Sequence, residues 1–249
     1  MNSRNKIFFP NLDSLRFAAF FAVFLSHVLL IHFPDSAYFS FASFIRNHAK
    51  TGVLGVNFFF VLSGFLITYL LLKERNENGD FNIPKFYVRR IFRIWPLYFA
   101  IVLFSFVVVP LLMPLLHKVF FEQSPAIFYF TFTVNFAFII GYFPYSSLLV
   151  ALWSISVEEQ FYFFWPWLLK FFKRNIFVLL LLIILVNLVS RFLLLDYPKA
   201  LYFNTLSIIS DFSIGGLIAF LSINYSEKFT QLFSVPKTVT VLFYISLVV

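Results

Sequence analysis

The residues best suited to chemistry begin with an arginine and a histidine inside one long apolar stretch. Arg16 and His27 lie 11 positions apart within residues 12–33. On an α-helix this separation is close to three turns, so the two residues share one face roughly 16 Å apart. Asp13 falls within about 40° of the same stripe. Because ionisable groups are costly in hydrocarbon, we expect the stripe to face the protein interior or a wet cavity.

His27 is the candidate for the central catalytic role. An imidazole titrates near neutral pH, so it can deprotonate a hydroxyl or carry an acyl group as a nucleophile. A histidine inside a membrane span can also serve only as a hydrogen-bond donor between helices. The alignment with Asp13 and Arg16 favours the catalytic interpretation, because a structural histidine needs no arginine on its own stripe.

A short basic run, RRIFR, places three arginines at positions 89, 90 and 93. Its plainest meaning is a topology signal, since basic segments stay on the cytoplasmic side of a membrane. Arg89 and Arg93 are also four residues apart and therefore share one helical face. Guanidinium groups bind phosphate oxygens in a bidentate fork. The run therefore also suggests binding of an anionic cofactor or of lipid headgroups.

A second polar stripe lies at the head of a later apolar stretch, LWSISVEEQFYFFWP. Ser154, Glu158 and Tyr162 recur at four-residue steps, so a hydroxyl, a carboxylate and a phenol line one helical face. Such a carboxylate can orient an imidazole and stabilise its protonated form. The alternative is a solvated helix start favoured by the helix dipole. The adjacent Glu159 points in another direction, so we expect one glutamate to serve any one site.

Asn57 and Ser63 are polar groups in another apolar stretch, GVNFFFVLSGF. Its glycines favour close approach of helices, while Asn57 can form hydrogen bonds inside a bundle. Arg191 and Asp211 lie in neighbouring antiparallel stretches, and we expect them to pair or to shape a cavity. No two histidines have metal-ligand spacing with a carboxylate, so we predict no metal site.

The composition indicates the kind of protein that positions these groups. The 249 residues are 61% hydrophobic and 12% charged, with a mean hydropathy of +0.89, whereas soluble chains are about 45–50% apolar and about 25% charged. The absence of cysteine excludes disulfides, thiolate nucleophiles and cysteine-bound metals. The net charge of +8 lies in short segments between apolar runs, so we expect no nucleic-acid partner. We predict an all-α, polytopic transmembrane helix bundle in the lipid bilayer.

The distribution of basic residues gives an expected topology with a cytoplasmic N-terminus. Residues 126–149 must then make an even number of crossings, so we expect a re-entrant or interfacial segment there. Another span begins near Lys237, which gives about eight spans or partial spans in a single integral-membrane domain, residues 1–249. Because the sequence ends inside an apolar run, we expect it to be truncated at the C-terminus. The remaining expected spans are 12–33, 53–72, 94–116, 152–169, 176–195 and 202–221.

Four motifs together resemble the acyltransferase type 3 family, bacterial multi-pass enzymes that move acyl groups, usually acetyl, onto carbohydrates. They are LDSLRFAAFFAVFLSH, GVNFFFVLSGFLIT, FYVRRIFRIWPLY and LWSISVEEQFYFFWP, in this order over residues 12–166. Beyond them, only SDFSIGGLIAF is a loose echo. The chain departs from the family in having Asn57 where aspartate is common, and in having fewer expected spans than most members.

The resemblance implies roles for particular residues. The family's catalytic histidine falls on His27, its paired arginine on Arg16 and its essential carboxylate on Glu158. Its serine falls on Ser154, and the arginines linked with acyl-coenzyme A fall on Arg89 and Arg93. We expect Asp13, Asn57, Ser63 and Tyr162 to support the site.

The resemblance further implies an O-acetyltransferase of the cytoplasmic membrane. Acetyl-coenzyme A would be the cytoplasmic donor, and a cell-envelope carbohydrate would be the acceptor. An O-antigen, an exopolysaccharide, peptidoglycan and a small glycoside are all open as this acceptor. The donor's phosphates would bind Arg89 and Arg93, with Arg16 deeper and the thioester near His27. The competing hypothesis is a transporter or flippase whose buried charged groups form a substrate path. Such proteins often have two repeated halves, and no such repeat is found in this sequence.

Overall fold

The computed structural model describes residues 12–32, 51–117 and 122–225, excluding the side chains of residues 13, 25–32, 51, 52 and 116. Within these ranges the regular structure is entirely helical, which confirms the all-α prediction. The six longest helices are α1 (Leu12–His32), α3 (Thr51–Asn78), α4 (Ile83–Leu103), α9 (Leu152–Phe171), α10 (Ile176–Leu193) and α12 (Thr205–Asn224).

Several described helices are long and apolar enough to cross a membrane. Four such stretches occur in the described ranges: Val53–Asn78, Ile83–Leu115, Ile176–Leu193 and Pro198–Asn224. The polytopic membrane architecture is therefore confirmed. The expected count of about eight spans stays a prediction, because residues 33–50 and 226–249 lie outside the described part.

The helix that begins with α4 starts earlier than the sequence led us to expect. Instead of starting near residue 94, it begins at Ile83, where the Asn82 side chain accepts a hydrogen bond from the Lys85 backbone N–H at 2.8 Å. Pro84 in the first turn suits a helix start, since its missing N–H has no partner there. The basic segment between the expected spans 53–72 and 94–116 is thus mostly helix, and only residues 79–82 connect α3 to α4.

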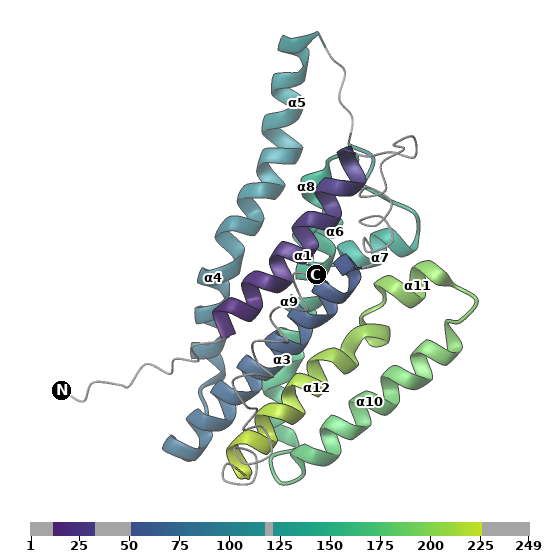
Figure 1. Ribbon diagram of the computed structural model, residues 1–249. Coiled ribbons are helices and arrows are strands. Elements are labelled where there is room, and N and C mark those ends of the chain that lie inside the picture. Colours follow the sequence, from purple (N-terminus) through teal and green to yellow (C-terminus); the bar gives the residue numbers. More distant parts are fainter. Residues whose placement is uncertain (1–11, 33–50, 118–121, 226–249) are drawn as a thin grey trace, which may run out of the picture.

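Prolines change the hydrogen-bonding pattern of this long helix without ending it near Pro96 or Pro110. A π-helical turn, Phe104–Val108, precedes α5 (Val109–Leu112), and a 3-10 turn, Met113–Leu116, follows it. Proline lacks a backbone donor, so a local change of helical pitch accommodates it. Figure 1 shows α4 and α5 as one continuous rod along the edge of the bundle.

Residues 126–150 form three short helices rather than a membrane crossing. They are α6 (Ile127–Phe130), α7 (Val134–Ile139) and α8 (Ser147–Val150). None approaches the ~20 residues that a crossing requires. The expected re-entrant or interfacial position of this segment stays a prediction. A further short helix, α11 (Pro198–Phe203), leads into α12.

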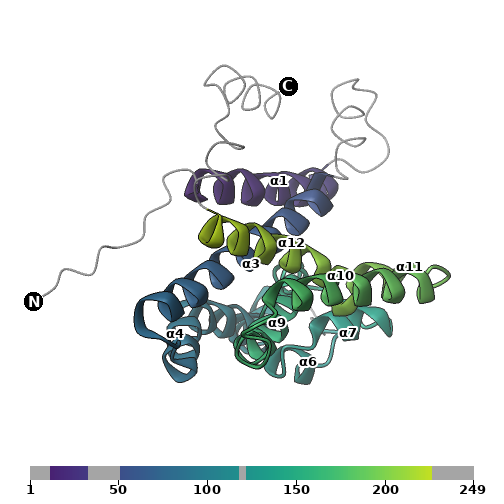
Figure 2. The same cartoon turned by 90° about the horizontal axis from the view of Figure 1, so that it is seen from below.

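The pair of α3 and α12 forms the centre of the bundle. In Figure 2 these two helices lie between α1 on one side and α9 and α10 on the other. A Cβ on Gly64 would overlap the backbone carbonyl of Phe212, and one on Gly215 would overlap that of Val61. The two glycines therefore allow the backbones to touch, as small residues do in membrane helix pairs.

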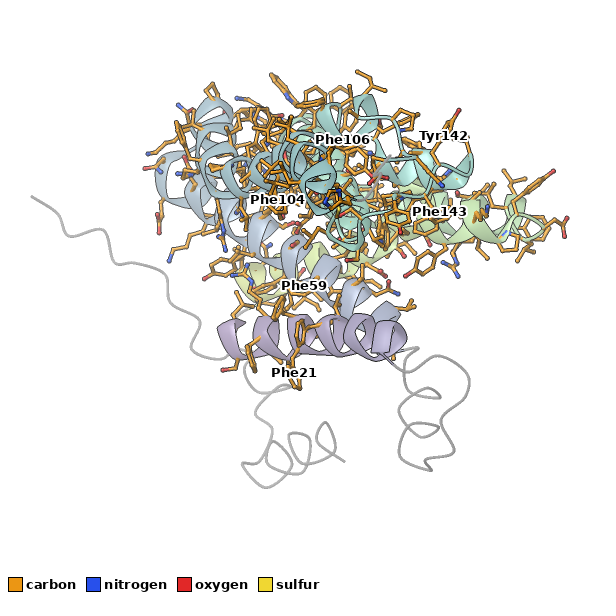
Figure 3. The ribbon with its side chains drawn as sticks, turned by 90° about the horizontal axis from the view of Figure 1, so that it is seen from above. Phe21, Phe59, Phe104, Phe106, Tyr142 and Phe143 are labelled. Carbon is orange, nitrogen blue, oxygen red and sulfur yellow. The ribbon has the colours of Figure 1, made fainter. Side chains whose placement is uncertain are left out.

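The outer surface of α1 is apolar. Phe21 projects from the side of α1 that is turned away from α3 (Figure 3), and Phe17, Phe20 and Phe24 are exposed beside it. The opposite side of α1 contacts α3, where a Cβ on Gly55 would come within 3.0 Å of the Ala19 carbonyl oxygen. A helix with one face packed against α3 and an exposed apolar face suits an edge position in a lipid-embedded bundle.

Candidate functional site

A carboxylate in the helix bundle binds two hydroxyl side chains, one from α3 and one from α9. Ser63 of α3 donates a hydrogen bond from Oγ to Glu158 Oε1. Tyr162, one turn along α9, donates from its hydroxyl to the same oxygen at 2.6 Å. The side chains of Ser63 and Tyr162 are 9% and 4% exposed, respectively. Two buried hydroxyls thus hold one oxygen of Glu158 in a fixed position.

The local sequence explains why these groups meet. Glu158 and Tyr162 are four residues apart, so the helical repeat of α9 stacks them. Closer to the α3–α4 connection on the same pair of helices, Trp165 donates from Nε1 to Thr68 Oγ1 at 3.0 Å. Two polar contacts at different heights therefore fix α3 against α9.

Arg90 of α4 supplies a positive charge beside this carboxylate. Its guanidinium carbon lies 5.5 Å from the centre of the Tyr162 ring and 5.7 Å from that of Phe86. These distances are typical of cation–π contacts. The side chain is half-buried, and the charges of Arg16, Arg93 and Glu158 lie close enough to act on it. The polar cluster (Ser63, Arg90, Glu158, Tyr162) therefore combines a held carboxylate with an adjacent cation.

Arg90 was expected only to belong to the basic run, with no role of its own in the site. Arg89 and Arg93 were the expected coenzyme-binding residues because of their four-residue spacing, whereas the structure places both at the exposed surface of α4. Arg89 donates to Glu74 Oε2 at 3.1 Å. A usable signal was present: counted from a helix start at Ile83, Arg90 falls on the four-residue stripe of Phe86, Tyr98 and Val102, which are buried.

Arg16, Asp13 and His27 all lie on α1. Arg16 is half-buried and close enough to Arg90 to interact electrostatically. The side chains of Asp13 and His27 lie outside the described residues. By the helical repeat, positions 16 and 27 fall at the border between the α3-facing stripe and the exposed phenylalanine stripe of α1.

Three other polar residues of the sequence analysis lie apart from the polar cluster. Ser154 donates from Oγ to the Ala151 carbonyl at 3.0 Å, so it bonds within its own turn of α9. Asn57 lines a separate cavity at the other end of α3. Glu159 points away from Glu158, and its Oε2 accepts a hydrogen bond from Trp95 Nε1 of α4 at 3.0 Å. Of the expected stripe of Ser154, Glu158 and Tyr162, only Glu158 and Tyr162 therefore belong to the polar cluster.

The α3–α4 connection is tied to the end of α9. Lys170 forms a salt bridge with Asp80 at 2.9 Å, and Arg75 donates from Nη2 to the Leu169 carbonyl at 2.8 Å. The hydrogen bond from Lys170, together with one from the Phe81 backbone N–H, lowers the pKa of Asp80. These contacts hold α3, α4 and α9 together at the end where α4 begins, below the polar cluster.

The geometry of the polar cluster suits proton handling. Both described hydrogen bonds to Glu158 go to Oε1, and among the described residues none donates to Oε2. That oxygen can therefore accept a hydrogen bond from an imidazole or from a substrate hydroxyl. A carboxylate in this position stabilises an imidazolium formed next to it.

Comparison with known proteins gives a family match over most of the chain. The model of a family described as an acyltransferase domain matches residues 9–249. The peptidoglycan O-acetyltransferase OatA of Listeria monocytogenes is 32% identical over 234 residues, which are 85% of this chain and 34% of that protein. The putative peptidoglycan O-acetyltransferase YrhL of Bacillus subtilis is 35% identical over 167 residues, 64% of this chain and 23% of that protein.

A putative O-acetyltransferase of Staphylococcus aureus is similarly related, with 33% identity over 165 residues, 64% of this chain and 24% of that protein. The chain thus spans between about a quarter and a third of the length of these relatives. No solved structure matches the chain.

Proposed function

The chain belongs to the acyltransferase type 3 family, and on this premise we propose that it transfers an acetyl group to a hydroxyl of a cell-envelope carbohydrate. The names of the relatives support both parts of this proposal, since two of them are named for acetylation of peptidoglycan. A cell-wall glycan is therefore the acceptor class that we favour over an O-antigen or an exopolysaccharide.

The proposed donor is acetyl-coenzyme A, entering from the cytoplasmic side. Arg89 and Arg93 are exposed on the first three turns of α4, where they can meet the phosphates of the coenzyme. Arg90 and Arg16 lie deeper and extend the positive charge toward Glu158. The proposed orientation, with the N-terminus in the cytoplasm and the protein in the cytoplasmic membrane, follows from the basic residues near this end of the bundle.

In the proposed reaction, the His27 imidazole removes the proton of a sugar hydroxyl as its oxygen attacks the thioester carbonyl carbon. The C–S bond breaks, the C–O ester bond forms, and the proton passes from the imidazolium to the departing coenzyme A sulfur. In the alternative route, the imidazole first takes the acetyl group and releases coenzyme A, and the sugar hydroxyl then attacks the acetyl-imidazole. Glu158 and Arg16 act as positioning groups in both routes.

The observation that carries this proposal is the arrangement around Glu158. A carboxylate fixed by Ser63 and Tyr162 has one oxygen open to a partner and a cation, Arg90, beside it. Ionisable groups inside a membrane bundle are costly and typically functional. Mass spectrometry of the protein incubated with acetyl-coenzyme A alone separates the two routes, because only the covalent route gives acetylated His27.

The test of the function is acetyl transfer in membranes that contain the protein. Wild-type membranes should transfer labelled acetyl from acetyl-coenzyme A to cell-wall glycan, while Glu158→Gln and His27→Ala should lose transfer and still insert. Glu77→Gln, at an exposed position on α3, is the matched control and should retain transfer. Movement of a glycan across the membrane without acetyl turnover would instead support the transporter hypothesis.

A further inference from the structure

A second polar site lies at the opposite end of α3 and α9 from the α3–α4 connection. It is a cavity of about 600 Å³ between α3, α9, α10, α11 and α12, within the size range of small-molecule sites. Figure 1 shows α11 close to the first turns of α3 and α12, which line the same cavity. The residues that matter for its chemistry are Asn57, Trp153, Arg191, Tyr202, Ser210 and Asp211.

The cavity contains two opposite charges that do not neutralise each other directly. Arg191 of α10 donates from Nη1 to the Ser207 carbonyl at 3.1 Å, and no salt bridge joins it to Asp211. The half-buried carboxylate of Asp211 receives no hydrogen bond from any residue that the structure describes. A cation and a carboxylate within membrane helices, each with bonding capacity to spare, are typical of a substrate site.

Aromatic rings form part of the same wall. The rings of Trp153 and Tyr202 lie 5.3 Å apart, and Tyr202 is 37% exposed. Aromatic faces pack against the C–H faces of sugar rings, while carboxylates and amides bind the hydroxyls at the ring edge. An aromatic wall combined with Asp211 and Asn57 is therefore suited to a carbohydrate, whereas an apolar ligand would leave the polar groups unsatisfied.

The cavity stands close to the polar cluster along two helices. Asn57 precedes Ser63 by six residues on α3, and Trp153 precedes Glu158 by five on α9, so the axial separations are about 9 and 8 Å. Phe60 lies between these levels and packs against Trp153 and Phe212, with ring centres 6.4 and 4.7 Å apart. A sugar in the cavity would thus approach Glu158 from the side opposite to the donor, with aromatic rings between them in this conformation.

We propose that this cavity binds the carbohydrate acceptor. Asp211 accepts hydrogen bonds from sugar hydroxyls, the rings of Trp153 and Tyr202 cover one face of the sugar, and Arg191 pairs with an anionic substituent such as a carboxylate. The identification of this ligand as the acceptor rests on the proposed acetyl transfer, whereas binding itself does not require it.

The test measures glycan binding to the purified full chain in detergent by calorimetry, without acetyl-coenzyme A. The probes are a disaccharide of N-acetylglucosamine and N-acetylmuramic acid, which carries a carboxylate, and the uncharged N-acetylglucosamine disaccharide. Arg191→Gln should weaken binding of the acidic probe about tenfold or more, the cost of a lost charge-assisted hydrogen bond, and leave the neutral probe unchanged. Asp211→Asn should weaken binding of both probes.

Arg191→Lys keeps the charge and should retain most of the preference for the acidic probe, which guards against a variant that merely misfolds. Arg174→Gln, at an exposed position after α9, is the control and should bind as wild type. Two results would overturn the assignment. One is that the wild type binds neither probe, and the other is that Arg191→Gln and Asp211→Asn both bind the probes as tightly as the wild type does.

The same variants separate this assignment from the proposed function. If the wild type transfers acetyl groups and both variants bind glycan as the wild type does, the proposed function is supported and the proposed acceptor site is contradicted. If glycan binding depends on Arg191 and Asp211 but the wild type transfers no acetyl group, the glycan site is supported and the proposed function is contradicted.

Discussion

Removing the Tyr162 hydroxyl tests whether the contacts around Glu158 serve catalysis. In Tyr162→Phe the ring stays in place, but the 2.6 Å hydrogen bond to Glu158 Oε1 is lost. A hydrogen bond to a charged group contributes about 1.5–3 kcal/mol. If that energy holds the carboxylate in its working position, kcat for acetyl transfer should fall by roughly 10- to 100-fold. The KM values for donor and acceptor should stay unchanged, because Tyr162 contacts neither in the proposed mechanism.

The assay compares initial rates of acetyl transfer in membranes with equal amounts of inserted protein. Tyr87→Phe is the matched control, since its hydroxyl also donates a 2.6 Å hydrogen bond, from α4 to the Phe163 carbonyl of α9, but it does not touch Glu158. The double variant Ser63→Ala/Tyr162→Phe should lose less than the sum of the single losses in free energy, because both hydroxyls bind the same oxygen. A wild-type rate in Tyr162→Phe, or an equal loss in Tyr87→Phe, would refute the reasoning.

Three further predictions concern the donor side, the helix packing and the pH dependence of stability. Arg90→Gln should lower kcat because the cation lies beside Glu158, whereas Arg89→Gln should mainly raise the KM for acetyl-coenzyme A; identical effects in steady-state kinetics would contradict this division. Gly64→Val should push α3 away from α12 and destabilise the protein by about 1–3 kcal/mol or more, and an unchanged melting temperature would count against the close packing. Because the hydrogen bond from Lys170 lowers the pKa of Asp80, the salt bridge should add less than about 1 kcal/mol to the stability of the protein above the ordinary pKa of an aspartate. The stability difference between wild type and Asp80→Asn, measured by unfolding at several pH values, should vanish once the pH falls below the lowered pKa of Asp80.

The sequence predicted the helices and one half of the polar cluster well, because both follow from local periodicity. The four-residue step from Glu158 to Tyr162 and the apolar lengths of α9, α10 and α12 depend only on neighbours along the chain. The start of α4 was predicted about 11 residues too late, because the basic residues were taken to mark the cytoplasmic segment before the span. A capping asparagine followed by Ile83 and Pro84 was the local signal for an earlier start.

The other half of the polar cluster depends on contacts between distant segments. That Ser63 bonds Glu158, 95 residues away, follows from how α3 and α9 pack and has no periodic signature. The same holds for Arg90, whose inward position depends on where α4 begins and on which side of it α9 lies. Arg191 and Asp211 were expected to pair or to shape a cavity, and they line one cavity without a direct salt bridge.

The most direct test of the central claim uses proteoliposomes with the two substrates on opposite sides of the membrane. Labelled acetyl-coenzyme A is supplied at the face that carries the start of α4, and the muramic acid-containing glycan is enclosed on the other side. Wild type and Glu77→Gln should place label on the enclosed glycan, while Glu158→Gln and His27→Ala should not. Label transfer that persists at the wild-type rate in Glu158→Gln would contradict the assignment of the reaction to this part of the bundle.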